Sequence, residues 1–166
     1  VGISKYPPAQ AKIAYEMLRA AGVPCLISQY RYSMFDRTVE EKSLPLAAEQ
    51  GSGFIAFSPL AQGLLTKKYL HGIPEHSRAA RSTGFLKVDQ VTEDKVGKAR
   101  RLDEIAARRG QTLAEMALAW VLKDERMTSV IVGTSSVKQL ADNLHALDNL
   151  NFTNEELAEI EGILRL

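Results

Sequence analysis

The sequence has one cysteine, no long apolar run and almost no net charge. Cys25 alone cannot form a disulfide within the chain, and with no signal peptide visible the expected compartment is a reducing cytoplasm. No stretch approaches the roughly 20 apolar residues that span a bilayer. The formal net charge of +1 gives no support to non-specific binding of nucleic acids or membranes. The three histidines have no metal-ligand spacing with one another or with Cys25.

What the chain does contain is the size and apolar content of one ordinary globular domain: 166 residues, 45% of them hydrophobic. Short apolar runs alternate with patterns of helical period. We predict strands at 1–4, 25–30, 54–57 and 129–132. We predict helices at 8–21, 38–50, 92–109, 112–124, 136–147 and from 153 to the end, with capping boxes at Thr38, Thr112, Ser136 and Thr153.

Four strand–helix repeats with continuously apolar strands are typical of an α/β protein with a parallel sheet covered on both faces. Four such units make half of an eight-stranded (β/α) barrel, and an open four-stranded sheet is the competing interpretation. Half a barrel would leave two unpaired edges. The sequence also begins inside a strand-like run, at Val1. We therefore expect that the N-terminal part of a larger chain is absent from this sequence.

The loops that follow two of the predicted strands are the candidate ligand-binding segments. The run Phe57-Ser58-Pro59-Leu60-Ala61-Gln62-Gly63 follows one strand, and Gly133-Thr134-Ser135-Ser136 joins another strand to a helix. Ligands of α/β proteins bind at the carboxyl ends of strands, and a helix N-terminus is a ready anion site. The two exits together predict a phosphate-bearing ligand.

Taken in order, these segments resemble the C-terminal half of an aldo-keto reductase. The matching segments are 2–6, 29–33, 56–66, 68–69, 72–74, 77–78, 133–135, 139 and 142–143. The long connection 63–91 most resembles the branch that holds bacterial L-glyceraldehyde 3-phosphate reductases and the β subunits of voltage-gated potassium channels. The resemblance implies a single partial domain over 1–166: strands five to eight of a (β/α)8 TIM barrel, with their helices.

The resemblance also implies NADPH-dependent reduction of an aldehyde or ketone. The family's catalytic Asp, Tyr, Lys and His lie on strands one to four, so no residue here is assigned as catalytic, Tyr30 and Tyr32 included. The residues expected to bind the cofactor are Ser4, Lys5, Gln29, Phe57, Ser58, Leu60, Gln62, Lys68, Arg78, Gly133, Ser135, Gln139, Asp142 and Asn143.

The family's pattern divides these residues by the part of NADPH that each would contact. Ser4, Lys5 and Gln29 would bind the nicotinamide carboxamide, and Phe57 would stack on the ring. The segment 58–62 would meet the pyrophosphate, and the connection 63–91 would fold over the cofactor with its basic side chains on the phosphates. The residues from 133 to 143 would bind the 2′-phosphate and adenine.

Three of these positions depart from the family's pattern. Lys5 stands where Asn or Ser is usual, Gln139 where many members have Arg, and Asp142 where many have Glu. The last two predict a moderate preference for NADP over NAD.

Two rival interpretations stay open: a regulatory NADPH-binding subunit like the potassium channel β subunits, and a free-standing half barrel that only binds nucleotide or assembles in pairs. The expected partner is a small carbonyl substrate, with no nucleic acid and no membrane; a homo-oligomer is left open.

Overall fold

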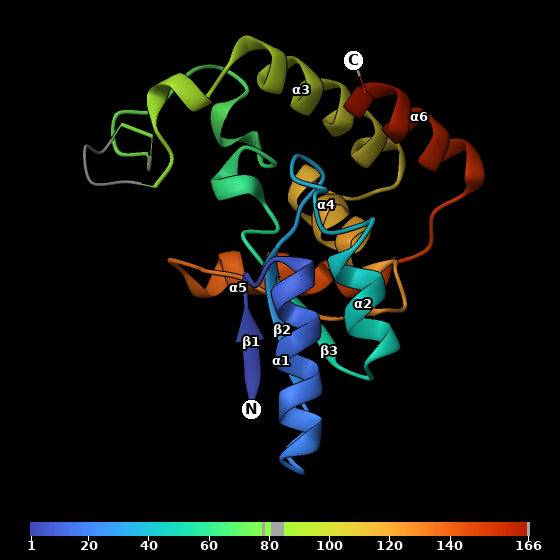
Figure 1. Cartoon of the computed structure of the whole chain (residues 1–166). Coiled ribbons are helices and arrows are strands. Elements are labelled where there is room, and N and C mark those ends of the chain that lie inside the picture. The colour runs from blue at the N-terminus through green and yellow to red at the C-terminus, as the bar shows by residue number, and fades with distance from the viewer. Residues whose placement is uncertain (78, 81–84, 166) are drawn as a thin grey trace. The chain divides into compact units, whose positions relative to one another are not determined.

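The computed structural model describes residues 1–77, 79–80 and 85–165. The chain forms two compact units. The first contains residues 1–59 and 121–133, and the second contains residues 60–120 and 134–166 (Figure 1). No helix among the described residues is both long enough and apolar enough to cross a membrane.

The first unit is built on a four-stranded parallel sheet. Its strands lie in the order β1 (Gly2–Ser4), β2 (Ile27–Arg31), β3 (Gly53–Phe57) and β4 (Met127–Ile131). The prediction of an α/β chain with four parallel strands is confirmed. β4 begins earlier than predicted because Met127 already pairs with Phe54, and the register shifts at the next step. Thr128 fills the shift by accepting a hydrogen bond from the Phe54 amide through its Oγ1, at 3.0 Å.

Helices α1 (Pro8–Ala20) and α2 (Ser43–Glu49) pack against one face of this sheet. Burial alternates along β2 and β3, as the two-residue period of a strand requires. Ser28, Tyr30, Phe54 and Ala56 are buried, and the side chains between them are only half-buried. The sheet therefore has one face that its own unit's helices cover and one face that they do not.

A chain of buried polar groups joins α1 to the covered face. The Tyr15 hydroxyl is 2.6 Å from the Ser28 hydroxyl, which is 2.9 Å from that of Ser52. Ser52 donates onward to the Cys25 sulfur. Cys25 is buried but lies before the strand, since β2 begins at Ile27 and not at residue 25 as predicted. These bonds satisfy hydroxyl groups that burial would otherwise leave unpaired.

The predicted helix start at Thr38 is wrong. Residues 38–42 form turns, and α2 begins at Ser43 with no side-chain cap. The Thr38 hydroxyl donates to Asp36 at 2.9 Å. Nearby, the Glu40 carboxylate accepts hydrogen bonds from the Arg37 guanidinium and the Tyr32 hydroxyl. These local bonds hold 36–40 in turns, and a helix needs the same backbone in a different conformation.

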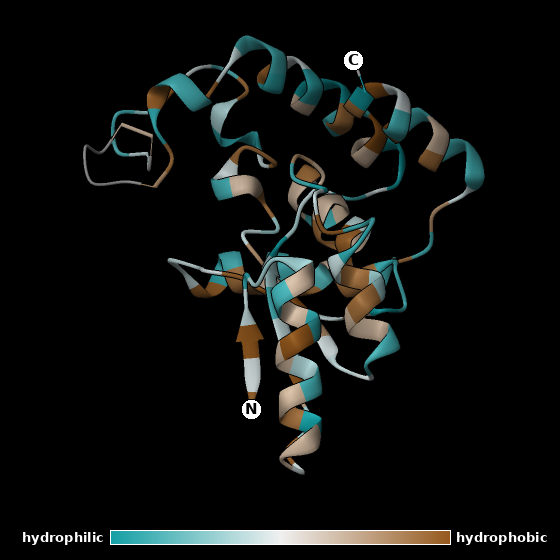
Figure 2. Cartoon of the chain, in the orientation of Figure 1, coloured by the Kyte–Doolittle hydropathy of each residue, from teal (hydrophilic) through white to brown (hydrophobic). Residues whose placement is uncertain are grey.

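The second unit is mainly helical. It contains most of α4 (Leu113–Leu122) together with α3 (Glu93–Arg108), α5 (Val137–Leu144) and α6 (Asn154–Arg165). Short 3₁₀ helices lie at η1 (Ala61–Gly63), η2 (Lys67–Tyr69), η3 (Val88–Gln90) and η4 (His145–Asp148). α3 and α6 lie side by side, with hydrophilic stretches along both (Figure 2).

Two predicted capping boxes are confirmed in this unit. The Thr112 and Glu115 side chains exchange bonds with each other's backbone amides at 3.2 and 2.7 Å, which starts α4. Thr153 and Glu156 do the same before α6, at 3.2 and 2.8 Å. The Thr92 hydroxyl caps α3 by accepting from the Lys95 amide.

Candidate cofactor-binding site

The sheet register brings Ser4 and Gln29 together. They are direct partners across β1 and β2, so their side chains leave the same face of the sheet on strands about 4.8 Å apart. Ser28 and Tyr30, on either side of Gln29, are buried against the helices. The Ser4 hydroxyl and the Gln29 amide therefore lie on the other face, where together they can donate to and accept from a carboxamide.

Phe57 ends β3 on this same uncovered face. It is half-buried, whereas Phe54 and Ala56 are fully buried on the helix side. Its register partners are Arg31 on β2 and Ile131 on β4. Gln29 pairs with Ile55, so Phe57 lies two residues nearer the carboxyl edge of the sheet than the row of Ser4 and Gln29. A planar ligand bound to Ser4 and Gln29 could stack on the Phe57 ring.

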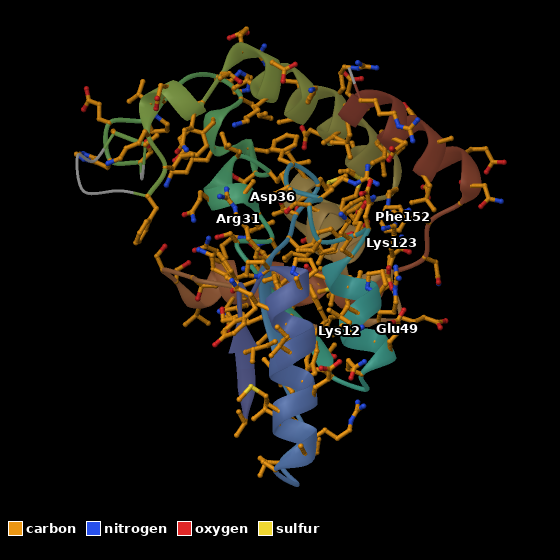
Figure 3. The ribbon with its side chains drawn as sticks, in the orientation of Figure 1. Lys12, Arg31, Asp36, Glu49, Lys123 and Phe152 are labelled. Atoms are coloured by element: carbon orange, nitrogen blue, oxygen red, sulfur yellow. The ribbon has the colours of Figure 1, made fainter. Side chains whose placement is uncertain are left out.

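Arg31 is a basic residue of this face that was not among the residues predicted to bind the cofactor. It lies two residues after Gln29 and opposite Phe57, and its Nε is 3.3 Å from the Asp36 carboxylate (both labelled in Figure 3). About half of its side chain is exposed. The sequence could have indicated this residue, because side chains two apart on a strand share a face and Arg31 follows Gln29 by two. Arg31 places a guanidinium at the carboxyl edge of the sheet.

The backbone leaves the strands in an unusual conformation. Lys5, Ser58, Ala61 and Gln62 have φ between 48° and 61°, and among the described residues they are the only non-glycine residues with positive φ. This left-handed region costs an ordinary residue about 1 kcal/mol or more, and such strain gathers at functional sites. Lys5, Ser58 and Gln62 are three of the residues predicted to bind the cofactor. The strain therefore coincides with the predicted site.

The second unit begins with the turn predicted to meet the pyrophosphate. Leu60 is half-buried and precedes η1, which contains Gln62. Lys68 lies in the middle of η2 with its side chain exposed. Arg78, also predicted to meet the phosphates, lies outside the described residues.

The junction between β4 and α5 has the predicted strand–turn–helix form. Gly133 follows β4 by two residues, and Ser136 caps α5 by accepting from the Gln139 amide at 3.1 Å. The reciprocal bond of the predicted capping box goes elsewhere. The Gln139 Oε1 accepts from the Ser135 amide at 2.9 Å and from its hydroxyl at 3.1 Å. Ser135 and Gln139, both predicted to bind the cofactor, are therefore in contact.

Asn143 lies one turn further along α5 than Gln139. It is only 9% exposed, and its Nδ2 is a buried donor with no hydrogen-bond partner among the described residues. A buried donor without a partner is rare, since it costs about 1–3 kcal/mol. An acceptor on a ligand would satisfy it. The nearby Asp142 carboxylate is already paired with Lys138, at 2.8 and 2.9 Å.

The hydroxyl groups of Tyr30 and Tyr32 are bonded to other parts of the chain and not directed to the candidate cofactor residues. Tyr30 stacks on Phe54 on the covered face and donates to the Tyr6 carbonyl at 2.8 Å. Burial raises the pKa of Tyr30 to about 12. Burial and the bond to Glu40 also raise the pKa of Tyr32 far above its ordinary value. Both hydroxyls therefore stay protonated and engaged at neutral pH.

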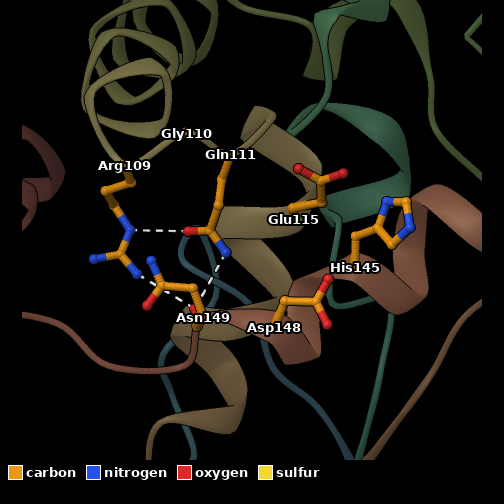
Figure 4. Close-up of a pocket in the computed structure, with 7 residues that line it drawn as sticks. All are labelled: Arg109, Gly110, Gln111, Glu115, His145, Asp148 and Asn149. Carbon is orange, nitrogen blue, oxygen red and sulfur yellow. Dashed lines mark hydrogen bonds between the residues drawn. The ribbon is translucent and has the colours of Figure 1, made fainter.

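A separate polar pocket in the second unit contains none of the predicted cofactor residues. Its volume is about 290 Å³, and Figure 4 shows its lining: Arg109, Gly110, Gln111, Glu115, His145, Asp148 and Asn149. Arg109 donates to Gln111, and Gln111 donates to the Asn149 carbonyl. The Arg109 guanidinium also pairs with Glu156 and lies 3.7 Å from the Phe152 ring centroid. These bonds tie 149–156 to the end of α3, which gives the cluster a structural role.

No group of His, Cys, Asp and Glu side chains in the described part of the chain could hold a metal ion.

Parallel α/β sheets bind ligands at the carboxyl ends of their strands, and here those ends carry amide, hydroxyl and aromatic groups. The comparison with known families is specific: the aldo/keto reductase family model matches residues 1–165, and the chain belongs to that family. An L-glyceraldehyde 3-phosphate reductase of Escherichia coli O157:H7 is 47% identical over 165 residues, which is 97% of this chain and 48% of the relative. The reductase of the same name from Escherichia coli K12 is 45% identical, with the same coverage. The chain spans about half the length of these curated relatives.

Proposed function

We propose that this chain is the cofactor-binding, C-terminal half of an NADPH-dependent aldo/keto reductase barrel that reduces an aldehyde or ketone. The observation that carries the proposal is the row formed by Ser4 and Gln29, with Phe57 one step beyond it toward the carboxyl edge. An amide and a hydroxyl beside an aromatic ring match the carboxamide and the plane of nicotinamide.

The remaining predicted residues fit the other parts of the cofactor by their chemistry. Lys68 supplies a positive charge for a phosphate. The N-terminus of α5 offers backbone N–H groups and the Ser135 hydroxyl to an anion. The unpartnered Nδ2 of Asn143 matches an acceptor nitrogen of a base such as adenine. These features support the fit of NADPH to this chain.

When bound, NADPH would supply the hydride for the carbonyl carbon. This chain's residues would hold and orient the cofactor: Ser4 and Gln29 would fix the carboxamide, and Phe57 would cover one face of the ring. The proton for the carbonyl oxygen would come from the half of the barrel outside this sequence. The names of the curated relatives make a phosphorylated aldehyde the substrate to test first.

The open surfaces of the structure fit half of a closed barrel. β1 and β4 are the two edge strands. Ile13 and Met17 lie exposed one turn apart on α1. Four further apolar residues of α5 and η4 are exposed: Val137, Leu140, Leu144 and Leu147. We propose that in the intact protein a further segment of the polypeptide or another chain covers these surfaces.

Fluorescence titration of the intact protein with NADPH tests the proposed function. We expect saturable binding that Gln29→Leu weakens, because leucine keeps the volume and removes the amide. Ser129→Ala is the matched control, since Ser129 follows in the same register row across β3 but was not assigned to the cofactor. Unchanged affinity in Gln29→Leu, or no binding by the wild type, would contradict the proposal.

A further inference from the structure

One face of α3 holds η2 at both ends. At the first residue of η2, the Lys67 ammonium pairs with the Asp103 carboxylate at 3.3 Å. At the other end, the Arg100 guanidinium donates two hydrogen bonds to the Leu70 carbonyl, from Nε at 3.0 Å and from Nη2 at 2.7 Å. Arg100 and Asp103 are three residues apart, so they lie on the same face of the helix. The short helix is thus clamped against α3.

This clamp determines where Lys68 points. A 3₁₀ helix has three residues per turn, so neighbouring side chains leave it in directions about 120° apart. With Lys67 directed to α3, the exposed Lys68 side chain points elsewhere. Among the described residues the Lys68 ammonium has no hydrogen-bond or ion-pair partner, while its backbone amide donates to the Thr66 hydroxyl at 3.2 Å. Thr66 in turn donates to the Gly63 carbonyl at 2.7 Å.

We propose that Arg100 is a positioning residue for cofactor binding, because it fixes residues 67–70 so that the Lys68 ammonium is presented to a cofactor phosphate. The inference rests on the proposed function and adds a residue that would not contact the cofactor. Holding a charged side chain in place before binding lowers the entropy that binding must remove. The effect of Arg100 should therefore appear in cofactor affinity and release, through Lys68.

The geometry requires an arginine. Leu70 is only 5% exposed, so water has poor access to it. Without the two hydrogen bonds from Arg100, its carbonyl would lose partners that water replaces poorly. The same guanidinium reaches Glu93 through Nη1 at 3.4 Å. A planar fork can make these contacts together, whereas a lysine has a single nitrogen and can reach only one of them well.

The test compares wild type, Arg100→Ala, Arg100→Lys and the control Arg101→Ala in the intact protein. Arg101 is the adjacent arginine of α3, is exposed, and is not part of the clamp. The Kd for NADPH is measured by fluorescence titration and the release rate by stopped flow. We expect Arg100→Ala to weaken binding about tenfold, mainly through faster release. Arg100→Lys should lie between wild type and Arg100→Ala, and Arg101→Ala should stay within twofold of wild type.

A double-mutant cycle with Lys68→Ala separates positioning from general stability. If Arg100 acts through Lys68, Arg100→Ala should change the Kd less than twofold once Lys68 is already alanine. The inference would be overturned if Arg100→Ala changed the Kd for NADPH equally in the wild-type and Lys68→Ala backgrounds, or if it left the Kd of the wild type unchanged. Binding of NADPH by the wild type would in either case leave the proposed function standing. If Arg100→Ala does not fold, Asp103→Asn loosens the other end of the clamp and should give the same non-additive pattern, more weakly.

Discussion

Replacing Asn143 by leucine should change stability and cofactor affinity in opposite directions. The side chain is nine-tenths buried, and its Nδ2 has no partner among the described residues. A buried donor in this state costs the folded protein about 1–3 kcal/mol. Leucine has a similar size and no donor, so it removes this cost. It is also the better helix former, by a few tenths of a kcal/mol.

The free energy of unfolding without cofactor should therefore stay unchanged or rise by about 1 kcal/mol. If the amide donates to the adenine of NADPH, the same substitution removes that bond. Binding should then weaken by about 1–3 kcal/mol, which is roughly 5- to 150-fold in Kd.

Urea denaturation of the cofactor-free protein and fluorescence titration with NADPH measure the two quantities. Ala141→Leu is the control, because it adds the same side chain at an exposed position of α5 and should affect neither strongly. Loss of stability in Asn143→Leu, with an unchanged Kd, would show that the amide serves the fold and would refute the reasoning.

Three further predictions concern the ring, the 2′-phosphate and pH. Phe57→Ala should weaken NADPH binding by about 1–3 kcal/mol by titration, the scale of burying a large apolar side chain; an unchanged Kd would exclude stacking. NADPH should bind more tightly than NADH, and more so at low salt, and Gln139→Arg should strengthen NADPH binding alone; equal, salt-independent affinities in the wild type would count against the phosphate assignment. Burial raises the pKa of Tyr30 to about 12, so the folded chain keeps a proton that the unfolded chain loses above pH 10. Its contribution to the free energy of unfolding should be fully present up to about pH 10 and be lost as the pH rises toward 12; denaturation at several pH values should show a smaller decline in Tyr30→Phe, in which Tyr15 and Tyr32, whose pKa values burial also raises, still contribute.

Composition and period were enough to predict four strands: the apolar runs at 54–57 and 130–132 stop at a serine-proline or glycine signal, whereas β2 carries polar residues and ends at Arg31 without such a signal. The helix predicted from Thr38 shows the limit of local rules. Its capping pattern, Thr38 with Glu41, is present, but the Thr38 hydroxyl donates to Asp36 and the neighbouring Glu40 is held by Arg37 and Tyr32; the spacing does not encode these local bonds. In contrast, Thr112 and Thr153 cap their helices as predicted, and the Thr153 box forms even though its Glu156 also pairs with Arg109.

Much of the candidate site could be named only through the family resemblance. The strand period places Gln29 and Arg31 on one face, but register decides that Ser4 and Phe57 are their neighbours. The positive φ at Ser58 and the partnerless Nδ2 of Asn143 could not be predicted from residue type. Both depend on how the chain folds around those positions.

Hydrogen–deuterium exchange of the intact protein, with and without saturating NADPH, shows directly whether this chain holds the cofactor. We predict slower exchange after NADPH addition at the strand exit 57–62 and at 135–143, with no change at 109–115 beside the separate polar pocket. Protection confined to other segments, or absent from both predicted ones while NADPH is bound, would contradict the assignment of this chain as the cofactor-binding half.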